Sequence, residues 1–204
     1  MRLPLLAAIL LAAALATGDL ARAQAPATPD PKAERRPVRA PVLDRAKQLD
    51  GLFEALKRAP DELIAKSIEQ RIEATMLHSG SDTADLLMVR ARTALQAKDN
   101  DLALELMDAV IAFDPEFVEA WAQRATLLYV KKDLGGALAD IRVVLAREPR
   151  HFGALTGLGV ILQDIGENKH ALDAFRRALA LHPHLKAVPE FIKKLEVKVE
   201  GLDI

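Results

Sequence analysis

The chain has 204 residues, of which 50% are hydrophobic, 4% are aromatic and none is cysteine. Its 28 basic and 29 acidic residues give a formal net charge of −1. This balance excludes a strongly basic nucleic-acid surface. Because the chain has no cysteine, disulfides, thiol catalysis and cysteine-based zinc sites are also excluded.

Residues 1–23 have the organisation of a secretory signal peptide. A basic start at Arg2 precedes an apolar run, and Ala21-Arg22-Ala23 fits a small-residue cleavage site. We predict cleavage near Ala23-Gln24 and a mature chain without a stable membrane anchor. The alternative is an uncleaved anchor, which the run of about 14 residues disfavours because a spanning helix needs about 20. The alanine-, arginine- and leucine-rich composition is typical of bacteria, so the expected location is the periplasm.

Residues 24–42 are predicted to form a flexible, proline-rich linker. Such a stretch lacks apolar residues to pack and cannot form a helix. Basic and acidic residues alternate between positions 30 and 39, which favours a solvated tether over an anion-binding surface. The linker holds five of the eleven prolines of the chain: Pro26, Pro29, Pro31, Pro37 and Pro41.

Residues 43–79 are predicted to form a helical pair. Apolar residues recur at helical spacing from about Leu43 to Lys57, and again from Pro60-Asp61 to about Leu77. This pair does not share the periodicity that follows it. It is either a degenerate repeat or a cap that covers the first true repeat, and we favour the cap.

A 34-residue period organises the next hundred residues. Prolines recur at Pro115, Pro149 and Pro183, and each follows an alanine by twelve positions. A fixed period in this range indicates an array of one repeated unit. Acidic residues mark the short gap between the two apolar runs of each unit, at Asp99, Asp133 and Glu167.

This pattern resembles the tetratricopeptide repeat, a helix–turn–helix unit with the motif W-x2-L-G-x2-Y, A-x3-F and P. The resemblance covers residues 84–183 and is carried most clearly by the third unit, with Leu155, Leu158, Gly159, Leu162, Ala171, Phe175 and Pro183. Arg90 and Arg124 replace the first leucine of the motif, and we expect both arginine heads to lie in water.

The predicted fold is therefore all-α, an α-solenoid of stacked helical hairpins. Three repeats lie within residues 80–183, in register at 84–117, 118–151 and 152–185, and a capping helix follows at 184–204. The segments 49–53, 78–87 and 150–155 are also similar to a group of exported alphaproteobacterial repeat proteins. That resemblance implies a periplasmic setting and brings no activity with it.

The first helix of each unit in such a stack lines a concave face, where we expect a partner protein to bind. The binding mode of tetratricopeptide domains that hold a C-terminal carboxylate needs several cations, whereas this face offers only Arg92. We expect instead an extended segment or an amphipathic helix of a partner. Helical spacing predicts the binding positions Asp85, Met88, Arg92, Glu119, Gln123, Thr126, Tyr129, Thr156, Val160 and Gln163.

Glycines at 153, 157 and 159 leave the first helix of the third unit unusually bare. They allow either close helix packing or the close approach of a ligand backbone, and we favour the packing.

The sequence offers little for catalysis. The histidines near Pro183 fall in predicted turns without a fixed acid beside them, so we expect no metal and no cofactor. No phosphate-binding loop or nucleophile motif is present, and we expect a binding protein rather than an enzyme. Two hypotheses remain: an adaptor that binds a protein segment, and a structural subunit that self-associates through its groove or apolar ends.

Overall fold

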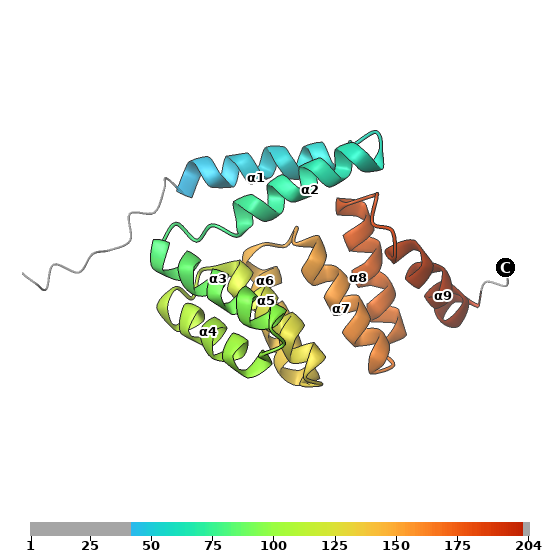
Figure 1. Cartoon of the computed structure of the whole chain (residues 1–204). Coiled ribbons are helices and arrows are strands. Elements are labelled where there is room, and N and C mark those ends of the chain that lie inside the picture. The colour runs from blue at the N-terminus through green and yellow to red at the C-terminus, as the bar shows by residue number, and fades with distance from the viewer. Residues whose placement is uncertain (1–41, 202–204) are drawn as a thin grey trace, which may run out of the picture. The chain divides into compact units, whose positions relative to one another are not determined.

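The computed structural model describes residues 42–201, so the predicted signal peptide and the linker up to residue 41 lie outside the described residues. The described part is all-α (Figure 1). Its helices are α1 (Val42–Lys57), α2 (Glu62–Met76), α3 (Asp82–Gln96), α4 (Asn100–Phe113), α5 (Val118–Val130), α6 (Leu134–Arg147), α7 (Phe152–Asp164), α8 (Asn168–Leu181) and α9 (Val188–Glu200).

Helices α3 to α8 form three stacked hairpins, and the periodic prolines end each one. The residues before the prolines, Asp114, Glu148 and His182, have φ angles of −134°, −131° and −134°. This is the extended conformation that proline imposes on its predecessor, so the helix cannot continue.

The turn inside each hairpin also keeps the 34-residue register. Lys98, Lys132 and Gly166 adopt left-handed φ angles of 62°, 66° and 86°. The acid that follows is the N-cap of the next helix: Asp99 Oδ1 accepts a hydrogen bond from the Leu102 N–H at 3.1 Å. The recurring acids are therefore capping residues in the first two units, whereas the third, a glutamate, makes no side-chain cap bond.

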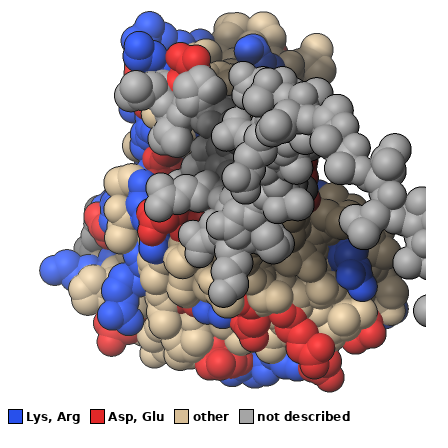
Figure 2. Space-filling model, turned by 90° about the vertical axis from the view of Figure 1, so that its left-hand side faces the viewer, with Lys and Arg blue, Asp and Glu red and all other residues tan. Residues whose placement is uncertain are grey.

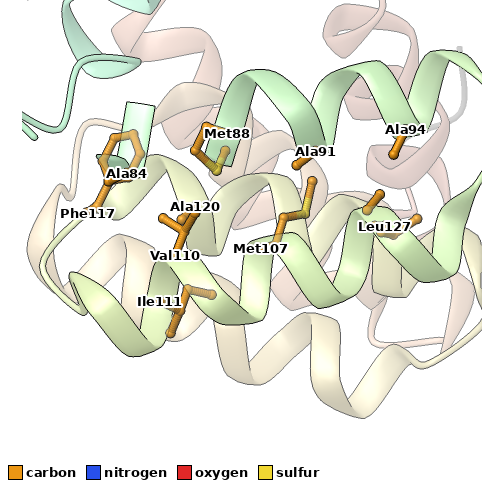
Figure 3. Packing of buried hydrophobic residues seen from close by; sticks show 11 residues of the cluster. Ala84, Met88, Ala91, Ala94, Met107, Val110, Ile111, Phe117, Ala120 and Leu127 are labelled. Atoms are coloured by element: carbon orange, nitrogen blue, oxygen red, sulfur yellow. The ribbon is translucent and has the colours of Figure 1, made fainter. Parts of the chain in front are cut away.

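Small residues let the two helices of each hairpin lie close together. In the first unit, Ala91 of α3 faces Met107 of α4, and Ala94 packs in the same cluster near Leu127 (Figure 3). In the third unit, a Cβ atom on Gly159 would lie 2.7 Å from Phe175 Cε1. Gly159 thus allows α7 to pack closely against α8, which is the role that we favoured for these glycines.

Helix α9 covers the C-terminal end of the stack. Val188 and Leu195 are each 1% exposed, and the rings of Phe175 and Phe191 stack with centroids 5.0 Å apart. Within residues 42–201, every helix is too short or too polar to cross a bilayer.

The N-terminal pair α1–α2 does not simply continue the stack. Its apolar residues form one buried cluster with Phe152 of α7, and α1 also packs against α8 (Figure 1). Polar contacts also join the pair to the turn between α8 and α9. His184 Nε2 lies 2.9 Å from the Ala59 carbonyl, and Lys186 Nζ lies 2.6 Å from Glu62 Oε1. The pair therefore packs on the third repeat and leaves Leu86 and Val89 of α3 exposed, so the expectation that it covers the first repeat is wrong.

The expectation that Arg124 extends into water is wrong. Its guanidinium donates two hydrogen bonds to the buried carboxylate of Asp140, at 2.8 and 2.7 Å, and a third to Asp108 at 2.6 Å. The bonds to Asp140 and Asp108 raise its pKa despite partial burial. Arg124 thus joins α5 to both α4 and α6, whereas Arg90, one repeat earlier, is exposed.

Candidate partner-binding groove

A hollow lies on the inner side of the stack, between the first helices of the repeats. It consists of two adjoining cavities, which together we call the groove. The first has a volume of about 300 Å3 and is lined by α5, α7 and Ile141 of α6. The second, of about 270 Å3, lies between α2, α3, α5 and α7. The two cavities share Glu119, Gln123, His151 and Gly153.

The wall between α5 and α7 combines small apolar side chains with a few hydroxyls. Thr126 and Thr156 each donate to the carbonyl four residues earlier, at 3.1 and 2.9 Å. Their donors are therefore occupied within the helices, and their lone pairs remain available as acceptors. Gly157 adds open space, because a Cβ atom there would meet nothing closer than Ile141 Cδ1 at 3.7 Å.

His151 begins α7 and faces the groove. Its Nδ1 accepts a hydrogen bond from the Ala154 N–H at 3.1 Å. Neutral imidazole carries one proton, so this bond places it on Nε2. That nitrogen lies 3.5 Å from Glu119 Oε2. This histidine cap was not predicted, although His151 stands at the turn position where the first helix of the repeat begins.

Helix α2 forms the opposite side of the second cavity. Glu73 lines it together with Ile72, Met76 and Leu77. Burial raises the pKa of Glu73, and repulsion from Glu69 and Glu119 raises it further. Sequence reasoning did not find α2 in this role, because no local pattern shows that a non-repeat helix folds back over the inner face.

Most of the predicted binding positions line the groove, namely Arg92, Glu119, Gln123, Thr126, Tyr129, Thr156 and Val160. Tyr129 also donates to Asp164 Oδ2 at 2.8 Å, which joins α5 to the end of α7. This hydrogen bond raises the pKa of Tyr129.

The other three positions differ from the prediction. Met88 is 1% exposed and packs in the core of the first repeat, so its assignment to the groove is wrong. Asp85 accepts hydrogen bonds from the N–H and hydroxyl of Ser79, at 2.8 and 2.7 Å, and fastens the α2–α3 turn. Burial opposes ionisation of Asp85, but these bonds outweigh it and lower the pKa. Gln163 is half-buried and lies outside both cavities.

A third cavity, of about 350 Å3, lies where α1 meets the turns before α3, α5 and α7. Two of its arginines are held in ion pairs. Arg150 donates to Glu148 and Asp50, and Arg147 Nη2 donates to Glu116 at 3.0 Å. Because these ion pairs join structural turns, we assign this cavity to the packing of α1 on the repeats.

Figure 2 shows basic and acidic residues side by side along the edges of one face, with uncharged residues between them among those described. Likewise, residues 42–201 bring together no group of three histidines or acids that could hold a metal ion.

Stacked two-helix repeats around an inner groove define a helical-repeat protein of the solenoid class. The chain is 40% identical over 154 residues to a TPR repeat-containing protein of Rhizobium etli, and the match covers 76% of each chain. It belongs to the tetratricopeptide repeat (TPR) proteins. No family model matches the sequence.

Solved structures agree on the fold. The first TPR domain of Spaghetti (RPAP3), bound to an HSP90 peptide, aligns with a TM-score of 0.55 at 17% identity, over 57% of this chain and 93% of that one. The crystal structure of MamA aligns with a TM-score of 0.54 at 15% identity, over 79% and 81% of the respective chains. At these identities the similarity establishes the fold alone.

Proposed function

We propose that the protein is an exported, periplasmic adaptor that holds a peptide segment or a helix of a partner protein in its groove. The observation that carries this proposal is the groove itself, with small apolar residues and free acceptors along α5 and α7. A bound segment would contact apolar surface and form a few hydrogen bonds, as in the known peptide-recognition modes. The TPR domain of Spaghetti, whose structure contains a bound peptide, supports the same mode of binding.

Site-specific photo-crosslinking in the exporting cell tests the adaptor. A photoreactive residue at Thr126, in the groove, should crosslink a discrete partner, whereas the same residue at the exposed Ala112 of α4 should not. Equal crosslinking at both positions would show that the groove is not the binding surface.

Export has its own test. N-terminal sequencing of the chain from the periplasmic fraction should begin at Gln24. A chain that retains Met1 and stays with the membrane would support the uncleaved anchor.

A second candidate function, self-association, is favoured by the apolar side chains that α3, the first helix of the first repeat, exposes. Leu86 is 60% exposed and Val89 is 48% exposed. In the second repeat, Ala120 occupies the position of Leu86 and is 0% exposed, because α4 packs on it. Among the described residues no helix covers α3 in this way, so a helix of another molecule could extend the stack there.

Light scattering distinguishes the two candidates. If α3 mediates self-association, the wild-type chain should be a dimer or larger, and Leu86→Asp should make it monomeric. Leu63→Asp is the matched control, since Leu63 is 80% exposed on α2. A wild-type monomer would leave the adaptor as the remaining function.

A further inference from the structure

The residues that line the groove carry more negative than positive formal charge. Glu73 of α2 and Glu119 of α5 supply the carboxylates, and Arg92 of α3 is the only guanidinium among the described lining residues. His151 Nδ1 accepts a hydrogen bond from the Ala154 N–H and is not available to a ligand. A ligand in the second cavity therefore meets two acids and one base.

Glu119 lies at the centre of this arrangement, because it lines both cavities and is only 17% exposed. Its Oε1 accepts a hydrogen bond from Gln123 Nε2 at 3.2 Å. Its Oε2 faces His151 Nε2 at 3.5 Å, which is longer than an ordinary hydrogen bond. Within the described part of the chain, neither oxygen has a lysine or arginine at ion-pair distance.

Glu73 faces the same cavity from the other side. Burial and the charges of Glu69 and Glu119 raise its pKa, and no cation among residues 42–201 offsets them. Arg92 thus lines the cavity without neutralising Glu73. Two carboxylates that share a partly desolvated hollow attract a cation strongly, because a charge-assisted hydrogen bond is about twice as strong as a neutral one.

We propose that the groove binds a partner segment that places one basic group between Glu73 and Glu119: a lysine, an arginine or a free amino terminus. The inference rests on the proposed function and specifies the chemistry of the partner. Small apolar residues of the same segment would lie along Ala122, Gly157 and Val160, where the wall has no charge. This preference is opposite in sign to that of a groove that binds a C-terminal carboxylate.

Selection from a displayed library of random peptides on the purified full-length chain tests the proposal. The enriched peptides should share a lysine or arginine at one fixed position. By fluorescence anisotropy, changing that residue of the tightest peptide to glutamine should weaken binding about tenfold, the effect of losing a hydrogen bond to a charged group.

Variants of the protein locate the effect. In Glu119→Gln, and independently in Glu73→Gln, the basic and glutamine peptides should bind with more similar affinities than they do to the wild-type chain. Glu105→Gln is the matched control, because Glu105 is exposed on α4 away from the groove, and it should keep the full tenfold difference.

Three other outcomes would overturn the inference. Enriched peptides without a basic preference would contradict it and leave the adaptor function standing, whereas failure to enrich any peptide would remove both. A synthetic peptide of residues 24–41, which contains four basic residues, serves as a further arm. If it bound more tightly than every selected peptide, the groove would belong to the chain's own N-terminal segment.

Discussion

Helices α3 and α5 begin consecutive repeats, yet equivalent residues on them have opposite environments. Leu86 of α3 is 60% exposed, whereas Ala120 of α5 is 0% exposed. Arg90 of α3 is exposed, whereas Arg124 of α5 is paired with a buried carboxylate. The repeat thus specifies where a residue lies on its helix, and its neighbours decide the environment there. Helix α4 of the preceding hairpin packs over Ala120, whereas Asp140, in the same hairpin as Arg124, pairs with that arginine.

The largest expected effect is at the ion pair that distinguishes α5 from α3. Asp140→Ala leaves the partly buried Arg124 without its main partner, which should lower the free energy of unfolding by about 3 kcal/mol. Urea denaturation measures this loss. Arg90→Ala is the control and should change stability by less than about 0.5 kcal/mol, as exposed substitutions do. Equal losses in both variants would mean that α3 and α5 do not differ in this way.

The next effect concerns the glycines of α7. Gly159→Ala adds a methyl group against the Phe175 ring. Overpacking costs about 1–3 kcal/mol and the gain in helix propensity returns about 1, so we expect a net loss of up to about 2 kcal/mol. Thermal unfolding measures it, and a variant more stable than the wild type would show that α8 can move aside.

A smaller effect is expected at the left-handed residue of each hairpin turn. Lys132→Gly should relieve a strained backbone and stabilise the chain by up to about 1 kcal/mol, because the left-handed conformation costs about 1–2 for other residues. Gly166→Lys is the reciprocal change and should destabilise by a similar amount. Urea titrations of both variants test the pair; shifts of the same sign would contradict the shared turn geometry.

The smallest effect is a pH dependence at the contact between α2 and the third repeat. Burial lowers the pKa of His182 below its ordinary 6.5, although Glu69 opposes this shift. The neutral form is therefore favoured in the folded state, so its contribution to stability is present above pH 6.5 and is lost as the pH falls through the lowered pKa. Unfolding free energies between neutral and mildly acidic pH should fall less in His182→Gln than in the wild type, and parallel curves would contradict the assignment.

The comparison of the repeats also shows which features the sequence could predict. The fold followed from the 34-residue period, since its prolines and capping acids act on neighbouring backbone. The groove followed in part: Thr126 and Val160 line it, whereas Met88 is buried, because the spacing of one helix does not determine which neighbour covers it. The contact between Ala59 and His184 joins residues far apart in the chain, so no local pattern predicts it.

The most direct test of the adaptor fills the groove while leaving the fold intact. Gly157→Leu places a side chain in the first cavity, where Gly157 lines the wall; Gly135→Leu places the same side chain on the exposed start of α6. Circular dichroism should show both variants folded. The crosslinked partner or the selected peptide should bind Gly135→Leu as it binds the wild type and should lose affinity for Gly157→Leu. Equal binding to both variants would contradict the claim that the groove holds the partner.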